Sequence, residues 1–483
     1  MIGVSAGMPP EVRWLPASWL PPAGEPESLA AQRALTAEFI RIEGDLDRFY
    51  SPKQALEFGD ASVYTGAAGI AYMFWRMAAL EAPYFTEQRD ALMAKAEAYS
   101  KVALRLARPH RRAGSASTLL TGAAGVWAVA AAIAFSRNET TKAAEFRREA
   151  LSFAPTAVCP GVPSECSTMY MLRAGGLTCV CVCVCVCVCI YAYEQVCQGV
   201  PSEVLYGRAG FLSCVLFMAA HAGLALRDVG DIVAGAVQLI LQDGRALAAV
   251  DAASHAGGAG SAGMFPLMWQ WHDKRYLGAA HGLCGILTIL LHLRSLVVGL
   301  GCDEQVQATI DAVLHARFPS GNLPSSLGST DDRLVHWCHG APGLVPMLCA
   351  AAEAYPDSRD EYLAAAAKAA EVICERGLLK KGVGICHGIG GNGLALLSLH
   401  RAVKRAGGDE TWRTLATRFA LFACKPACSE PERVKQQLLA APDRPHSLFE
   451  GAAGLACLFA AVLDSGNSDA PNRHAAAGCA WLM

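Results

Sequence analysis

Two short segments of the chain carry a Cys-His pair directly before a Gly-x-x-Gly turn. The first pair is Cys338-His339 and the second is Cys386-His387. Two thiolates and one imidazole are a donor set that binds a tetrahedral Zn²⁺ ion and leaves its fourth position open for chemistry. We therefore predict one zinc ion per chain, bound by Cys338, Cys386 and His387. The alternative is that the cysteines are core residues, because free Cys is among the most buried residue types.

The local sequence decides whether Cys386 and His387 can bind the same ion. Neighbouring residues in a regular helix diverge by about 100°, so both can face one ion only from an irregular turn. The glycines that follow them permit such a turn. A substrate thiol in the open position would be held as a thiolate, because coordination to zinc lowers its pKa. The predicted chemistry is the addition of a thiol to an electron-poor carbon.

The Gly-x-x-Gly turn is also the unit of an internal repeat. Each copy leads into a run that is apolar nearly all round, as expected for a helix buried on every side. Amphipathic segments such as Arg359 to Arg376 lie between these runs, and strand-like alternation is nearly absent. We predict an all-α fold in which seven pairs of inner and outer helices close into an α/α toroid, with an open solenoid as the alternative. The turns begin at Gly66, Gly122, Gly207, Gly282, Gly340, Gly388 and Gly451.

Composition limits the kinds of partner. The chain has 483 residues, 53% of them hydrophobic and 17% charged, with a formal net charge of −2. Nucleic acid is not expected as a partner, because no basic cluster is present. Ordinary apolar runs are interrupted before the ~20 residues that a transmembrane segment needs, so none is predicted. Twenty cysteines in a chain of long helix-like runs are expected to be reduced thiols, and we expect a cytoplasmic protein.

We expect a single toroid domain over residues 29–465, an irregular Pro-rich N-terminus over 1–28 and a C-terminal tail over 466–483. Residues 159–197 stand apart, because Cys and Val alternate from Cys179 to Cys189 as in a strand, which would have no neighbour in an α/α fold. Val158 to Glu165 is also nearly repeated by Val196 to Glu203. We interpret the stretch as an atypical insertion that is a retained non-coding segment or gene-model artefact. A surface insertion, a membrane hairpin and a metal-binding tract are the alternatives.

Several motifs are similar, in order and spacing, to those of the eukaryotic LanC-like (lanthionine synthetase C-like) proteins. The resemblance covers about residues 60–465 and implies a seven-fold α/α toroid with zinc on Cys338, Cys386 and His387. It also implies a glutathione transferase that adds glutathione to dehydroalanine or dehydrobutyrine residues in peptides or proteins, forming a thioether. Besides the glycine turns, the matching motifs are Ala279 to Gly282, Val335 to Gly343, Lys380 to Gly388 and Ser447 to Gly451.

Addition to a dehydroamino residue generates an enolate that must be stabilised and protonated. His281 directly precedes the fourth turn, and both this placement and the family motif assign it as the catalytic general acid or enolate stabiliser. A helix-capping or core histidine is the alternative. His339 is expected to be less suited, because it follows a metal ligand and can point away from the site.

Three further residues are predicted to bind substrate. Lys381 offers a positive charge near the metal and resembles a glutathione-carboxylate contact of the family, with a solvated lysine as the alternative. Asp443 matches a second glutathione contact, although Ala440 stands where the family pattern has an arginine. Arg208 can meet an anionic group of the substrate, with an internal ion pair as the alternative. At the level of function, the alternative is a non-catalytic zinc- and glutathione-binding scaffold or signalling regulator.

Overall fold

The computed structural model describes residues 13–15, 17–21, 28–107, 116–154, 200–254, 265–424 and 442–464. In this part of the chain, the regular structure is helical, and isolated β-bridges are present but no β-strand. The predicted all-α fold is therefore confirmed. The stretch 159–197 and Ala440 lie outside the described residues.

An inner layer consists of helices that each begin at a Gly-x-x-Gly turn. Their burial follows from composition, since a helix that is apolar around its circumference is stable only when surrounded. In the first of them, every residue is buried. The inner helices are α3 (Ala67–Ala78), α6 (Ala123–Ser136), α11 (Arg208–His221), α13 (Leu283–His292), α16 (Ala341–Ala354), α18 (Ile389–Arg405) and α21 (Ala452–Asp464).

An outer layer consists of amphipathic helices that pack with one face against the inner layer. Six of them contact the inner helix that precedes them in the chain, whereas α1 contacts the last inner helix, α21. In α1 the buried residues Leu35, Phe39, Ile42 and Leu46 recur at helical spacing. The outer helices are α1 (Leu29–Phe49), α5 (Arg89–Ala107), α7 (Thr140–Leu151), α12 (Gly230–Ser254), α15 (Asp303–His315), α17 (Arg359–Arg376) and α19 (Thr411–Ala423).

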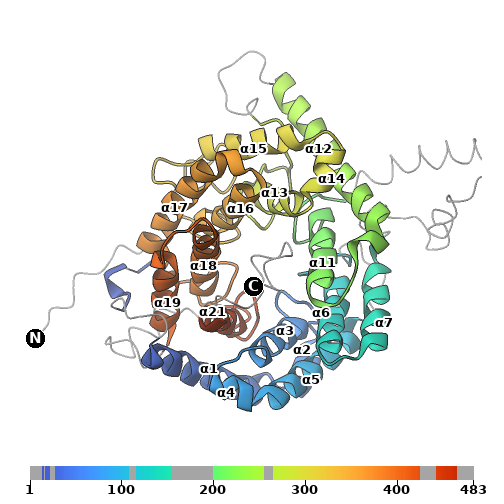
Figure 1. Ribbon diagram of the computed structural model, residues 1–483, viewed down its shortest axis with the longest axis vertical. Helices are drawn as coiled ribbons and strands as arrows, with labels where there is room; N and C mark the ends of the chain where they lie inside the picture. Colours follow the sequence, from blue (N-terminus) through green and yellow to red (C-terminus); the bar gives the residue numbers. More distant parts are fainter. Residues whose placement is uncertain are drawn as a thin grey trace, which may run out of the picture.

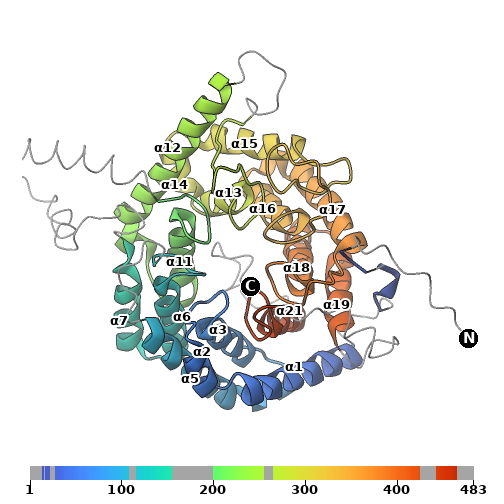
Figure 2. The ribbon, with the colours of Figure 1, turned by 180° about the vertical axis from the view of Figure 1, so that it is seen from behind.

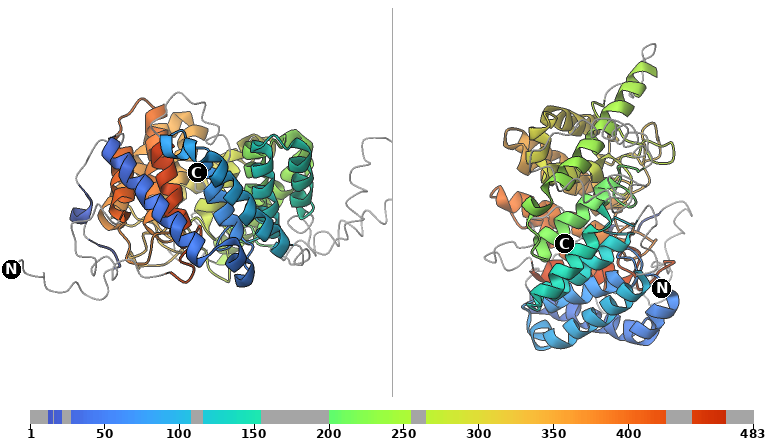
Figure 3. Two further views of the ribbon diagram at one scale, coloured as in Figure 1. Left: turned by 90° about the horizontal axis from the view of Figure 1, so that it is seen from below. Right: turned by 90° about the vertical axis from the view of Figure 1, so that its right-hand side faces the viewer.

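Contacts between helices close the inner layer into a toroid. Each inner helix contacts the inner helices before and after it, and α21 contacts both α18 and α3. Figures 1 and 2 show the closed toroid from its two faces, and Figure 3 shows it from two sides. The predicted toroid is confirmed, and the open solenoid is wrong. Short helices α2 (Pro52–Phe58), α4 (Pro83–Glu87) and α14 (Arg294–Gly299) and 3-10 turns η1 (Ala17–Trp19), η3 (Leu226–Val229) and η5 (Pro356–Ser358) complete the described helical structure.

Backbone hydrogen bonds join the seven turns to one another at the end of the toroid where the inner helices begin. The series returns to its start, because Phe449 N–H donates to the Tyr64 carbonyl at 3.0 Å. Side chains from different repeats are therefore held around one mouth. Going around the toroid, the backbone N–H to carbonyl pairs are Tyr64 to Leu120, Leu119 to Gly210, Val204 to Ala280, Ala279 to Trp337, Cys338 to Cys386, Cys386 to Phe449 and Phe449 to Tyr64.

Close packing explains the second glycine of each turn. A Cβ atom added at Gly343 or Gly391 would overlap the carbonyl oxygen of Trp337 or Ile385, respectively, six residues earlier. Gly340 is required for a different reason, because its φ of +123° lies in a region that residues with a side chain rarely adopt. These turns therefore cannot accept larger residues without moving the cysteines beside them.

One described stretch, Leu226–Ser254, is long and apolar enough to span a membrane by length and composition alone. It contains η3 and α12, and α12 packs against α11 as the outer helix of the third pair. The buried residues of α12 include Val233, Val237 and Ile240, which lie on one side of the helix. Packing in the toroid therefore buries one apolar face of α12, while 33% of the apolar window as a whole is buried.

Candidate active site

Equivalent residues from the seven turns lie immediately before the first glycine of each turn. Because the turns are hydrogen-bonded to one another, these residues are neighbours around the mouth. His339, for example, is close enough to both His281 and His387 to be affected by their charges. In order around the toroid, the position is occupied by Thr65, Thr121, Tyr206, His281, His339, His387 and Glu450.

The structure brings the three predicted metal ligands together. The Sγ atoms of Cys338 and Cys386 and a ring nitrogen of His387 all lie within 4.8 Å of one another. Cys338 precedes α16 and the other two precede α18, and a hydrogen bond of 3.2 Å from Cys338 N–H to the Cys386 carbonyl holds the two turns side by side. Among the described residues, these three form the group of His, Cys, Asp or Glu side chains whose ligand atoms are close enough together to hold a metal ion.

The ionisation of the two cysteines suits a cation. The hydrogen bond from Cys338, followed by that from His387, lowers the pKa of Cys386 to about 5 despite burial. The same bond between the two sulfurs, and then burial, raises the pKa of Cys338 well above its ordinary value. The lowered pKa favours a thiolate in this pair, and two sulfurs with one imidazole fit the donor set of a zinc ion.

Tyr64, from the first turn, also reaches the metal ligands and was not anticipated from the sequence. Its hydroxyl hydrogen-bonds Cys386, and burial, followed by the negative charge of Cys386, raises the pKa of Tyr64. The aromatic ring of Tyr64 stacks on Phe449, with centroids 4.5 Å apart and planes 19° apart. The tyrosine is thus fixed as a neutral donor to a ligand that lies two turns away around the toroid.

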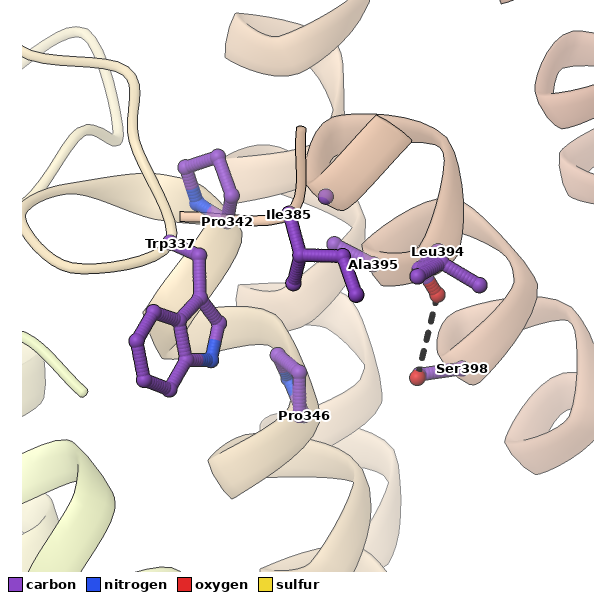
Figure 4. Close-up of a pocket in the computed structure, with 8 residues that line it drawn as sticks. Trp337, Pro342, Pro346, Ile385, Leu394, Ala395 and Ser398 are labelled. Atoms are coloured by element: carbon purple, nitrogen blue, oxygen red, sulfur yellow. Dashed lines mark hydrogen bonds between the residues drawn. The ribbon is translucent and has the colours of Figure 1, made fainter. Parts of the chain in front are cut away.

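Apolar side chains anchor the two ligand turns between α16 and α18. Trp337 and Ile385 directly precede the cysteine ligands, and both line a small pocket between these helices (Figure 4). The hydroxyl of Ser398, which also borders the pocket, donates to the Leu394 carbonyl at 3.2 Å. The pocket surface is therefore mainly apolar, and the side chains before the ligands are held by packing. The remaining lining residues are Pro342, Pro346, Gly391, Leu394 and Ala395.

His281 is oriented by a buried carboxylate. Its Nδ1 atom lies 2.7 Å from Oε2 of Glu203, whose side chain is 2% exposed. Glu203 also accepts hydrogen bonds from the backbone N–H groups of Leu205, at 2.9 Å, and Tyr206. Where Glu203 accepts this bond, His281 donates from Nδ1. This leaves Nε2 of His281, whose side chain is 20% exposed, as the atom that can exchange a proton at the mouth.

Glu203 is a candidate functional residue that the sequence did not single out. A signal was present, because it lies four residues before the first glycine of its turn, and no other turn has an acid there. The equivalent residues in the other turns are Ser62, Thr118, Gly278, His336, Gly384 and Ser447.

Aromatic residues surround His281. The centroid of its imidazole lies 6.1 Å from that of Tyr206 and 5.9 Å from that of Trp271, with planes 14° and 15° apart. Tyr276 lies at 5.8 Å from His281 in a tilted arrangement, and also contacts His339 at 5.4 Å. One side of the mouth is therefore an aromatic wall.

His339 faces the mouth, although the sequence suggested that it can point away. It contacts Tyr276, and burial, followed by the charge of His281, lowers the pKa of His339 to about 4. Lys381 is exposed, and its positive charge acts on both Cys338 and His339. The predicted positive charge beside the metal ligands is therefore in position, and its role in binding glutathione stays a prediction.

The two other predicted substrate contacts differ in their surroundings. Asp443 is exposed, and its charge acts on Glu450 at the mouth, where burial is the main influence that raises the pKa of Glu450. Arg208 is not open to substrate, because its side chain is 1% exposed and pairs with Asp243 at 2.7 Å. It also donates to the Val200 carbonyl at 2.6 Å. Arg208 therefore forms the internal ion pair that the sequence analysis gave as the alternative.

Fold and site together define the class of protein: a closed α/α toroid with a Cys-Cys-His donor set and an oriented histidine at one mouth. Comparison with solved structures agrees on the fold, since the toroid resembles nisin cyclase with a TM-score of 0.56. That similarity covers 88% of this chain and 93% of the cyclase, at 15% sequence identity.

Sequence comparison then gives the family. Residues 57–473 match the family described as lanthionine synthetase C-like protein, and the chain belongs to this family. It is 33% identical to LanC-like protein GCL1 of Arabidopsis thaliana over 402 residues, or 83% of this chain and 78% of the plant protein. It is also 33% identical to glutathione S-transferase LANCL1 of Danio rerio over 279 residues, or 56% of this chain and 62% of the fish protein.

Proposed function

We propose that this protein is a zinc-dependent enzyme that adds the thiol of glutathione to dehydroalanine or dehydrobutyrine residues in peptides or proteins. The observation that carries the proposal is the placement, around one mouth, of the Cys338-Cys386-His387 donor set and of His281 held by Glu203. The glutathione S-transferase name of the fish relative supports glutathione as the thiol.

Cys338, Cys386 and His387 would hold the zinc ion. Zinc bound there would lower the pKa of a thiol that joins it and so supply a nucleophile at neutral pH. Lys381, exposed beside these ligands, would bind a carboxylate of glutathione, and Asp443 a second polar group of the tripeptide. Together they would direct the thiol of glutathione toward the mouth rather than toward solvent.

His281 would complete the addition by supplying a proton. As the thiolate sulfur bonds to the β-carbon of the dehydroamino residue, the electrons of the C=C bond move to the α-carbon and its carbonyl group. His281 would transfer a proton from Nε2 to the α-carbon, so that the proton lost by the thiol is replaced in the product. Glu203 would stabilise the charged imidazole through the 2.7 Å contact at Nδ1.

Mass spectrometry tests the proposal. The zinc-loaded chain, glutathione and a dehydroalanine peptide should form the thioether adduct faster than the uncatalysed mixture. His281→Ala should slow the addition by about 10²-fold with zinc still bound, which is typical for loss of a general acid. His315→Ala, on the outer helix α15, is the matched control and should keep the wild-type rate.

Two outcomes would contradict this function. If the zinc-loaded protein binds glutathione without accelerating addition to any dehydroamino peptide, the scaffold function replaces the enzymatic one. If it binds neither zinc nor glutathione, the activity implied by the family does not hold for this chain.

We also propose a reducing, cytoplasmic location. The nine cysteines in the described part of the chain are all free thiols, and most are buried, which is usual where glutathione keeps thiols reduced. Fractionation of cells that express the tagged protein is the test, and recovery outside the cytosolic fraction would contradict it.

A further inference from the structure

Three aromatic rings at the mouth share one orientation. The centroids of Tyr206, Trp271 and His281 form a triangle with sides of 5.8, 5.9 and 6.1 Å. Their planes differ by 14° to 23°. Three points at equal separations cannot lie on one line, so the rings do not form a column. They are near-parallel and offset from one another, because centroids about 6 Å apart are too close for rings that share one plane.

A strained hairpin holds Trp271 in this group. Trp271 and Lys274 are joined by two backbone hydrogen bonds of 2.9 and 3.0 Å around the two-residue turn His272-Asp273. Both turn residues have positive φ, 44° and 58°, which is unfavourable for residues other than glycine and is found at functional sites more often than elsewhere. The segment that leaves the hairpin is fixed by the ion pair of Arg275 with the buried Asp251.

Two members of the group are partly exposed to solvent. Tyr206 is 36% exposed, and Trp271 is partly exposed, although aromatic side chains of this size are usually buried. His281, the third member, is the residue to which we assign proton transfer. A flat molecule that stacks on Tyr206 or Trp271 would therefore lie beside the imidazole of His281.

We propose that Tyr206 and Trp271 form an aromatic platform on which the planar unit of the acceptor stacks, so that the site selects dehydroamino residues over saturated ones. This inference rests on the proposed function. In a dehydroamino residue the α- and β-carbons are sp², and conjugation with the carbonyl group keeps the unit flat, so it can stack on an aromatic face. Serine, cysteine and the thioether product have a tetrahedral α-carbon and cannot lie flat. The platform would thus favour substrate over product.

Binding measured without glutathione tests the platform separately from catalysis. Isothermal titration calorimetry would compare a dehydroalanine peptide with the same peptide carrying alanine at that position. The wild-type protein should bind the dehydroalanine peptide about tenfold more tightly, the scale of one stacking contact. Trp271→Leu should reduce this preference to about twofold or less, whereas Trp271→Phe, which keeps an aromatic face, should retain most of it.

Matched variants make the result specific. Trp412→Leu removes a partly exposed tryptophan from the outer helix α19 and should keep the tenfold preference. Tyr206→Leu provides a second test if Trp271→Leu does not fold, as judged by its melting temperature and zinc content. The platform would be overturned if the wild-type protein bound the two peptides equally or bound neither. It would also be overturned if the preference were unchanged in both leucine variants.

The two proposals fail in different ways. A protein that prefers the dehydroalanine peptide through Trp271 but forms no adduct with glutathione would retain the platform and refute the enzyme. A protein that forms the adduct without any preference dependent on Trp271 or Tyr206 would refute the platform alone.

Discussion

The carboxylate of Glu203 lies 2.7 Å from Nδ1 of His281, although 78 residues separate them in the chain. The contact depends on the closed series of hydrogen bonds between turns. Val204, next to Glu203, donates from its backbone N–H to the carbonyl of Ala280, next to His281. This backbone bond holds the two residues side by side, and Glu203 accepts from the backbone N–H groups of Leu205 and Tyr206 as well as contacting His281.

Glu203→Gln should slow the addition of glutathione by about 10-fold to 10²-fold, because a neutral amide stabilises a charged imidazole less well than a carboxylate does. Zinc content and melting temperature should stay near wild type, and the pH dependence of kcat should shift, which a purely structural role would not cause. Glu38→Gln is the control, since Glu38 is an equally buried carboxylate, 3% exposed, on the outer helix α1. An unchanged rate and pH profile in Glu203→Gln would contradict the role assigned to Glu203.

The sequence was sufficient for features that are local or repeated. A glycine turn followed by an all-round apolar run specifies an inner helix, and two Cys-His pairs at equivalent places specify a shared site. Contacts that depend on closure were not predictable. Tyr64 reaches Cys386 only because the first and seventh turns are joined. Arg208 pairs with Asp243 because α12 packs on α11, which no periodicity reveals.

The wild-type chain should contain one zinc ion, and Cys338→Ala and Cys386→Ala should each lose it. Removing one of three protein ligands leaves too few soft donors to retain the metal. Cys349→Ala and Cys457→Ala are matched controls, since both thiols are buried in inner helices beyond the turns. Metal analysis by plasma mass spectrometry is the measurement. Stoichiometric zinc in both ligand variants would rule out the assigned site.

Lys381→Ala should raise KM for glutathione about tenfold, because loss of one charged hydrogen bond to a carboxylate weakens binding by about this amount. Zinc content should be unaffected, since Lys381 is exposed and is not a ligand. The adjacent Lys380 is a close control, because it carries the same charge but Lys381 is the lysine among the main influences on Cys338. The backbone N–H of Lys380 donates to the carbonyl of Arg13 at 3.1 Å. Equal effects of Lys380→Ala and Lys381→Ala would mean that general positive charge, not a specific contact, is responsible.

Arg208→Met should lower the free energy of unfolding by about 2 kcal/mol, because breaking the pair leaves the partly buried Asp243 without its partner. KM for glutathione should stay within about twofold of wild type, since a side chain that is 1% exposed is not accessible to substrate. Urea denaturation and steady-state kinetics measure the two effects. Arg227→Met, at an exposed site in η3, should change neither. A large rise in KM with wild-type stability would restore the substrate-binding role predicted for Arg208.

His292, the last residue of α13, should make the stability depend on pH. Burial lowers the pKa of His292 to about 4, whereas the unfolded chain has an ordinary value near 6.5. Between these values the unfolded chain binds a proton that the folded protein does not, so the free energy of unfolding falls as the pH decreases. Above about pH 6.5 the contribution is fully present.

Replacing His292 by leucine should remove this dependence. Between pH 7 and pH 4.5, the wild-type protein should lose about 1–2 kcal/mol more stability than His292→Leu, measured by urea denaturation at each pH. Comparing the two proteins cancels the titration of groups that they share. His315→Leu, at an exposed site in α15, should follow the wild-type curve. Parallel curves for the wild-type protein and His292→Leu would show that His292 does not resist protonation in the folded state.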